Sequence, residues 1–395
     1  MSTSQWSSTN SLTTKASYVP VYENGFLSPT NGANSRFGTS VAISDDGNYI
    51  IVGARTDLEL SQSGAVYIFF KSGATWTQQA KLKSGSTAIN GFFGASVDID
   101  ATGTRCVVSS HISGGYNYVF LRTGTSWTLE ASFFRSGRSS TDYEVKSSIS
   151  GDGATIITGS YGYNGYTGLA TIYTRVNTTW TQKANLTGSG VVANDAFGYD
   201  VSINSNGTYA IVGTQRGPVF GFAFIYVYTT SWTLQSKIIP SDSKNPDGFG
   251  ISVDINGAGD RVIIGAPSAT APTYQGKAYI YTRSGTTWTQ EATLVISDGA
   301  NDPGGPGRRV SMSRDGSSAI IAGYAAPVSG LSNAGKSFLF TRSGTTWTQR
   351  GVLTASNPTA NAYYGYGLAI SADGLVLIIG AADYSSNIGR VYINT

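Results

Sequence analysis

The sequence predicts an all-β protein, a seven-bladed β-propeller with four antiparallel strands in each blade, in which residues 1–395 form a single domain. Three observations favour this fold class. A module of about fifty residues recurs along the chain, and repeats of that length are typical of propellers. No segment shows the periodicity of a helix. Tryptophan marks the repeat, spaced by 51 to 59 residues, at Trp76, Trp127, Trp180, Trp232, Trp288 and Trp347.

The first module shows the order of strands that we expect in every blade. It starts at Phe37-Gly38, and residues 38–44 are expected to line the central channel as the inner strand. Asp46-Gly47 then makes a tight hairpin, because such turns need residues that tolerate a positive φ. Residues 49–52 are continuously apolar, as expected of a second strand that is buried on both faces.

The outer strand of the module has a different pattern. A third strand resembling Val-Tyr-Ile-Phe is followed by residues 76–82, which alternate between large apolar and polar side chains. That period of two indicates a strand with one face in water. Modules start near residues 37, 93, 143, 197, 249, 308 and 366. The Phe-Gly pair is replaced at three of these starts, by Tyr143-Glu144, Arg308-Arg309 and Tyr366-Gly367.

The two ends of the chain are expected to complete one blade together. The last module stops at Thr395, before an outer strand, whereas Trp6 and Leu12 have the same spacing as Trp76 and Leu82. We therefore predict that an N-terminal strand at about residues 5–13 completes the seventh blade and closes the ring. Residues 14–36 form the longest connection in the repeat, and we interpret them as an ordered surface feature.

The recurring Phe-Gly pairs, in register with a tryptophan every fifty-odd residues, resemble the FG-GAP repeat propellers, a group that includes the head of the integrin α subunit. The resemblance covers nearly the whole chain, and it is closest to the microbial and viral sub-type with Trp-Thr-Gln-x-Ala-Lys-Leu, here at residues 76–82 and, with Asn185 in place of the lysine, at 180–186. Many members also carry a calcium loop in the first hairpin of the blade, with oxygen ligands at alternate positions.

In this chain the calcium pattern is broken. The nearest approaches are Asp98 with Asp100 and Asp254 with Asn256, and each lacks at least one of the later ligands. We expect ordinary turn chemistry at these positions and no cofactor, with calcium as the alternative.

Composition narrows the class of partner. The net charge is +3 and the basic residues are scattered, so we expect no nucleic-acid partner. No apolar stretch approaches the ~20 residues that span a membrane, so we expect no membrane insertion. The N-terminal residues contain no apolar core of a Sec signal peptide. A surface rich in Gly, Ser, Thr, Asn and Tyr favours an extracellular location or the surface of a virion or particle.

Catalytic motifs are not found in the sequence. The single histidine, His111, has no clustered partners of the kind that metal sites and triads need. Cys106 lies in an apolar run and is interpreted as a core residue. We therefore predict that the protein is not an enzyme. A hydrolase or lyase with paired carboxylates, for example Asp142 and Glu144, stays open as an alternative.

The loops on one face of the ring combine tyrosine with polar residues. Tyrosine offers a large contact area and a hydrogen-bonding tip, which suits the recognition of sugars or proteins. Arg308 and Arg309 place positive charge near the channel, where they hold an anionic group or pair with Asp298 or Asp302. The predicted binding residues are Tyr161, Tyr163, Tyr166, Arg216, Phe220, Tyr274, Arg308, Arg309, Tyr363 and Tyr364.

These observations favour a non-enzymatic binding or adhesion module that recognises a glycan or a protein through this face. The alternative is a structural subunit of a viral or other extracellular assembly, in which loops and outer strands contact neighbouring subunits.

Overall fold

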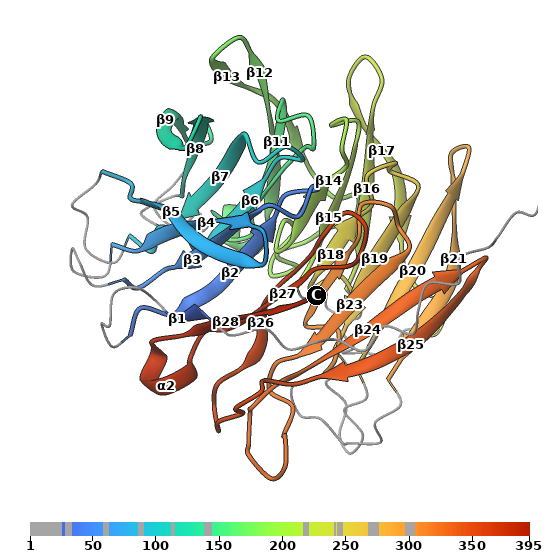
Figure 1. The fold of residues 1–395 in the computed structure, drawn as a ribbon. Coiled ribbons are helices and arrows are strands. Elements are labelled where there is room, and N and C mark those ends of the chain that lie inside the picture. The colour runs from blue at the N-terminus through green and yellow to red at the C-terminus, as the bar shows by residue number, and fades with distance from the viewer. Residues whose placement is uncertain are drawn as a thin grey trace, which may run out of the picture.

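The computed structural model describes residues 26–27, 34–57, 63–85, 91–111, 115–137, 144–215, 221–240, 242, 248–267, 276–296 and 305–395. These residues form seven sheets, each of four antiparallel strands, arranged around a central axis (Figure 1). The helical segments among them are short, α1 (Tyr163–Tyr166) and α2 (Tyr384–Asn387). No helix in this described part is long and apolar enough to cross a membrane. The predicted all-β, seven-bladed propeller is confirmed.

The two strands nearest the axis are short and buried. The inner strands are β2 (Phe37–Ile43), β6 (Ser96–Ile99), β10 (Glu144–Ile149), β14 (Val201–Ile203), β18 (Val253–Ile255), β22 (Arg309–Met312) and β26 (Tyr364–Ile370). The second strands are β3 (Tyr49–Ala54), β7 (Arg105–Ser110), β11 (Thr155–Ser160), β15 (Tyr209–Gly213), β19 (Arg261–Ala266), β23 (Ser318–Gly323) and β27 (Leu377–Ala381).

The two strands farther from the axis are longer in most blades, but not in the last one. The third strands are β4 (Ala65–Ser72), β8 (Tyr116–Thr123), β12 (Leu169–Val176), β16 (Ala223–Tyr228), β20 (Lys277–Ser284), β24 (Lys336–Ser343) and β28 (Arg390–Asn394). The outer strands are β5 (Thr75–Leu82), β9 (Ser126–Phe133), β13 (Thr179–Leu186), β17 (Trp232–Ile238), β21 (Thr287–Val295), β25 (Thr346–Leu353) and, in the last blade, β1 (Phe26–Leu27).

The phenylalanine of the Phe-Gly pair fixes one blade against the next. Phe93 is fully buried, and its backbone bridges Gly64, which precedes the third strand of the first blade. A Cβ on Gly64 would lie 2.2 Å from the carbonyl oxygen of Phe93, so only glycine allows this approach. The same bridge joins Gly168 to Phe197.

This contact corrects the predicted starts of the last two modules by two residues. Pro306 places its carbonyl oxygen 1.9 Å from where a Cβ on Gly276 would lie, and Tyr364 does the same at 2.1 Å from Gly335. Pro306-Gly307 and Tyr364-Gly365 therefore take the place of Phe-Gly. The predicted starts, Arg308 and Tyr366, are the residues that directly follow these two pairs. The sequence register failed there because proline and tyrosine replace the marker phenylalanine.

The ring is closed by the first described residues. Phe26 pairs with Val391 and Leu27 with Arg390, so β1 is the outermost strand of the last sheet, beside β28 (Figure 1). Phe37 also bridges Gly389 of the last blade, as Phe93 and Phe197 bridge the blades before them. An N-terminal strand therefore completes the seventh blade as predicted, but the strand seen there is 26–27. The predicted strand at 5–13, and most of the predicted loop 14–36, lie outside the described residues.

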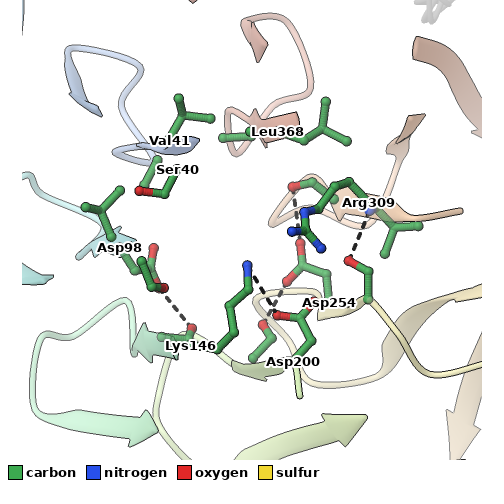
Figure 2. Close-up of a pocket in the computed structure, with 18 of the residues that line it drawn as sticks. Ser40, Val41, Asp98, Lys146, Asp200, Asp254, Arg309 and Leu368 are labelled. Carbon is green, nitrogen blue, oxygen red and sulfur yellow. Dashed lines mark hydrogen bonds and ion pairs between the residues drawn. The ribbon is translucent and has the colours of Figure 1, made fainter. Parts of the chain in front are cut away.

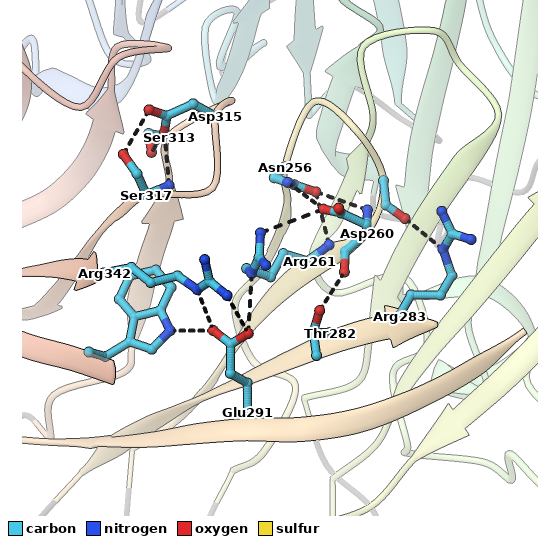
Figure 3. Close-up of polar contacts among 12 residues, drawn as sticks. Asn256, Asp260, Arg261, Thr282, Arg283, Glu291, Ser313, Asp315, Ser317 and Arg342 are labelled. Atoms are coloured by element: carbon cyan, nitrogen blue, oxygen red, sulfur yellow. Dashed lines mark hydrogen bonds and ion pairs between the residues drawn. The ribbon is translucent and has the colours of Figure 1, made fainter. Parts of the chain in front are cut away.

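Buried carboxylates join the blades near their outer strands. Glu291 accepts hydrogen bonds from Arg342 Nε at 2.7 Å and Trp347 Nε1 at 2.7 Å, and it faces Arg261 Nε at 3.5 Å (Figure 3). Glu130 makes the equivalent contacts with Arg105, Arg175 and Trp180. At two other seams the tryptophan donates to a glutamine, Gln79 or Gln235. The repeated tryptophan thus links neighbouring blades.

Candidate functional site

The inner strands surround a central channel that contains a cavity of about 170 Å³ (Figure 2). Register with the second strands shows which side chains lie at the same level. We call one set the mouth ring, because it lies toward the loops that join the second and third strands: Ser40, Ser96, Lys146, Asp200, Ser252, Arg309 and Gly367. The middle ring lies two residues further along each strand: Ala42, Asp98, Ser148, Ser202, Asp254, Ser311 and Ala369.

Most polar side chains of the mouth ring have a structural task. An inner strand is an edge strand, and its amides need acceptors. Ser96 Oγ accepts from the amide of Ser147 at 3.2 Å, and Asp200 Oδ2 accepts from the amide of Val253 at 3.0 Å. Ser252 does the same for the next inner strand. These side chains therefore join one inner strand to the next.

The carboxylates of the middle ring act in the same way. Asp98 Oδ2 accepts from the amide of Ile149 at 2.8 Å and from Ser148 Oγ at 2.9 Å. Asp254 accepts from the amide of Met312 at 2.9 Å and from Ser202 Oγ at 2.7 Å. Burial raises the pKa of both carboxyl groups, against these hydrogen bonds and the charge of Arg314.

The weak calcium candidates are thus placed in two different environments. Asp98 and Asp254 lie in the channel, not in a hairpin loop. Asp100 Oδ1 accepts from the amide of Thr104 at 2.7 Å, and Asn256 Oδ1 accepts from the amide of Arg261 at 2.9 Å, so both close their own hairpins. Among the described residues, no three His, Cys, Asp or Glu side chains gather as a metal site would require. Asp100 and Asn256 thus act as turn residues, whereas Asp98 and Asp254 join neighbouring inner strands.

At the mouth ring, two cations replace the acceptors. Lys146 of the third blade and Arg309 of the sixth occupy equivalent positions, since they pair with Gly159 and Ala322 respectively. Lys146 Nζ lies 3.8 Å from Asp200 Oδ1. Burial, and then the charge of Arg309, lower the pKa of Lys146 to about 8, against the opposing effect of Asp200. Both cations line the same cavity of the channel.

Tyrosines surround this cationic mouth in two groups. Tyr161 lies 5.5 Å from Tyr199, measured between ring centres, and belongs to the third and fourth blades. On the other side, Tyr324 lies 5.3 Å from Tyr366 and 6.0 Å from Tyr363. Burial raises the pKa of Tyr199, while the charge of Arg309 opposes this rise. The two tyrosine groups thus meet at the same mouth.

Arginine side chains lie over the second group. The guanidinium carbon of Arg309 is 5.5 Å from the centre of the Tyr366 ring, and that of Arg308 is 5.8 Å from the centre of Tyr324. Such contacts hold a cation over an aromatic face. The sequence prediction that Arg308 and Arg309 bring positive charge to the channel mouth agrees with this placement. Asp298 and Asp302, their suggested partners, lie outside the described residues.

The other predicted binding residues are placed as follows. Tyr166 is 44% exposed and Tyr163 lies under Arg135, so both remain at the loop face. Tyr364 is fully buried against Tyr392 and belongs to the core, because it replaces the marker phenylalanine. Three predicted residues lie outside the described part: Arg216, Phe220 and Tyr274.

Sequence reasoning missed Lys146, Asp200, Tyr199, Tyr324 and Tyr366. The signal was available, because the mouth ring lies three residues after each Phe-Gly phenylalanine, as Asp200 does after Phe197. Counting from Pro306 and Tyr364 would have found the last two blades as well.

Comparisons with known proteins agree with this architecture. The FG-GAP repeat family profile matches residues 27–69, 180–218, 232–281 and 347–393. The chain carries FG-GAP repeats. No curated protein matches the sequence of this FG-GAP propeller. A chain in the crystal structure of the mitotic checkpoint complex is similar with a TM-score of 0.59 and 11% identity, over 94% of this chain and 93% of that chain. At that identity, the likeness concerns the fold alone.

Proposed function

We propose that this FG-GAP propeller is a non-enzymatic binding module whose ligand docks on the channel mouth and the tyrosine-rich loops beside it. The observation that carries the proposal is the convergence of Tyr199, Tyr324 and Tyr366 around Arg309. We propose a glycan as the ligand, with a protein as the alternative, and an extracellular or particle-surface location.

Two features of the mouth suit a glycan. Tyrosine rings present flat apolar faces with a polar tip, and sugars offer both C–H faces and hydroxyl groups. The rings are also held in place, since Tyr324 contacts both Tyr363 and Tyr366. Side chains already fixed before binding lose less conformational entropy on binding.

The non-enzymatic part of the proposal rests on the roles of the carboxylates. The channel carboxylates Asp98, Asp200 and Asp254 accept hydrogen bonds from strand amides and join the blades. FG-GAP propellers are also generally non-catalytic. The alternative of a hydrolase built on Asp142 and Glu144 concerns side chains outside the described part.

The experiment is binding of labelled protein to a broad glycan array, with and without a calcium chelator. We expect chelator-resistant binding to a defined class of sugar. Replacing Tyr199 or Tyr324 by alanine is expected to weaken it about ten-fold or more, as for aromatic residues at the centre of an interface. Tyr228→Ala is the matched control, because Tyr228 is 45% exposed on a hairpin away from the mouth.

Two outcomes would contradict the proposal. Binding that Tyr228→Ala weakens as much as Tyr324→Ala would place the ligand elsewhere. Binding that the chelator abolishes would show that a metal ion is required.

A structural role in an assembly is the second candidate, and exposed apolar residues on the outer strands favour it. Leu129 is 50% exposed, Leu234 38%, Val295 55% and Val352 39%. Light scattering tests it: a monomer at high concentration supports the binding module, and a stable oligomer that dissociates on Leu129→Ser and Val295→Ser supports the structural subunit.

A further inference from the structure

Lys146 and Arg309 differ from the rest of the mouth ring in one chemical property. Ser96, Asp200 and Ser252 there accept hydrogen bonds from the next inner strand, but lysine and arginine have only donors. Neither cation can therefore perform the structural task of its equivalents Ser96, Asp200 and Ser252. Both nevertheless point into the channel (Figure 2).

Within the described part of the chain, the hydrogen bonds of Arg309 go to backbone carbonyl oxygens and not to a carboxylate. Its guanidinium donates to the carbonyl oxygens of Tyr366 at 3.2 Å and Arg308 at 3.2 Å. No carboxylate pairs with Arg309 among the residues that the structure describes, although its side chain lies within the channel lining. The two carbonyl bonds fix the guanidinium in one orientation, as a preformed donor needs.

The acidic groups that face this site are engaged elsewhere. Asp200 accepts from Val253 and faces Lys146, whereas Asp98 and Asp254 accept from the inner strands. Asp45, further down the channel, pairs with Arg314 at 3.2 Å. Three cations, Lys146, Arg308 and Arg309, therefore lie at the mouth with one acid, Asp200, whereas Asp98, Asp254 and Asp45 lie further down the channel.

We propose that the mouth selects an acidic sugar, whose anionic group, a carboxylate or a sulfate ester, is held between Lys146 and Arg309. The sugar ring would then lie against the tyrosines that flank these cations, Tyr199 on one side and Tyr324 and Tyr366 on the other. This inference rests on the proposed function and gives the class of glycan. Charge-assisted hydrogen bonds from a fixed guanidinium match the geometry of both anions.

The first test compares matched oligosaccharides by calorimetry. Oligogalacturonate is paired with its carboxyl-reduced form, and a sulfated lactose with lactose. We expect the acidic member of at least one pair to bind about ten-fold or more tightly than its neutral partner. Lys146→Met combined with Arg309→Gln should remove that preference, while Lys183→Met, at an exposed position of β13, should not. The two pairs distinguish the carboxylate from the sulfate ester.

A second measurement separates the inference from the proposed function. The thermal midpoint of the protein is followed against sodium acetate and sodium sulfate at constant ionic strength. A saturable rise in the native protein, absent from the double variant, supports the anion site without any glycan. Equal rises in both proteins would overturn the anion site.

The combined outcomes are as follows. Equal binding of acidic and neutral sugars, sensitive to Tyr324→Ala but not to the double variant, would overturn the acidic-sugar inference and leave the binding module intact. Binding of none of these sugars, with a saturable anion effect and capture of an acidic peptide at the same site, would overturn the glycan as ligand.

Discussion

Blades one to three and blades four to six place similar side chains at equivalent positions. Asp98 and Asp254 occupy the same site in the middle ring, and Glu130 and Glu291 occupy the same seam. Lys146 corresponds to Arg309. Tyr161 follows Gly159 by two residues, as Tyr324 follows Ala322. The pattern therefore repeats every three blades, which a seven-bladed ring does not require.

The two halves differ in the blade that follows each. The fourth blade presents Asp200 beside Lys146, whereas the seventh blade presents Gly367 at the equivalent position. A Cβ at Gly367 would lie 2.5 Å from the carbonyl oxygen of Gly38, so closure of the ring against the first blade leaves no room for a side chain. Lys146 consequently forms an ion pair with Asp200, whereas among the described residues none forms one with Arg309, on which Asp200 acts only from a greater distance. The packing of the seventh blade against the first therefore makes the channel mouth asymmetric.

The contacts of Glu130 and Glu291 between neighbouring blades are equivalent in the two halves of the ring. We expect the largest loss of stability when either glutamate is replaced. Glu130→Ala and Glu291→Ala each leave two partly buried arginines and an indole without their carboxylate. We expect each to lower the free energy of unfolding by about 3–5 kcal/mol, measured by urea denaturation. Gln79→Ala and Gln235→Ala, the neutral equivalents, should cost about 1 kcal/mol. A cost at Glu130 that differs greatly from that at Glu291 would break the comparison.

The carboxylates Glu130 and Glu291 at these seams also make the stability of the protein depend on pH in acid. Burial alone would raise the pKa of Glu130 and Glu291, but hydrogen bonds from arginine and tryptophan outweigh it and lower both pKa values. A lowered pKa gives stability that is present above the ordinary value and is lost as the pH falls through the lowered one. Acid unfolding of Glu291→Gln should therefore depend less on pH than that of the native protein.

The charged side chain of Lys146, in the third blade, is expected to lower the free energy of unfolding at neutral pH. The pKa of Lys146 is lowered to about 8, so the folded protein holds the charged lysine less well than the unfolded chain does. Above the ordinary lysine pKa the side chain is neutral in both states and costs nothing. The destabilisation grows as the pH falls below that value and is complete below a pH of about 8. Lys146→Met should thus stabilise the protein at pH ~7, by on the order of 2 kcal/mol, and this gain should shrink toward pH ~10. Thermal unfolding at the two pH values checks this, and a gain that does not change with pH would contradict it.

The asymmetry of the mouth predicts unequal binding effects. Arg309→Gln should weaken binding of an acidic sugar about ten-fold, and Lys146→Met about three-fold, because Asp200 already offsets the lysine charge. Calorimetry of the single variants measures the two losses. Equal losses would show that Asp200 does not distinguish the halves.

The smallest expected effect is that of removing the charge of Asp200, the carboxylate beside Lys146. Asp200→Asn keeps an oxygen that can accept from the amide of Val253, but removes the negative charge beside Lys146. Affinity for the acidic sugar should rise about two- to three-fold, and its salt dependence should increase. A fall in affinity would mean that Asp200 contacts the ligand directly.

Much of the fold could be predicted because it is written locally. The Phe-Gly pairs, the hairpin glycines and the tryptophans each recur in register, and apolar second strands such as β3 need only composition to be recognised. The errors occurred where the marker residue changed, at Pro306 and Tyr364. Tyr364 was also predicted in the binding face, and it is buried because its position, rather than its chemistry, decides its surroundings.

The seven blades and their four strands can be predicted from the amino-acid sequence, because each depends on a pattern that repeats about every fifty residues, and closure by an N-terminal strand follows from the incomplete last repeat. The sequence also indicated a tyrosine-rich face and positive charge near Arg308 and Arg309. Only the tertiary structure decided that Lys146, which lies 163 residues from Arg309 in the sequence, shares its mouth with that arginine. The physical reason is ring closure, which brings single positions of distant blades around one axis where their charges interact.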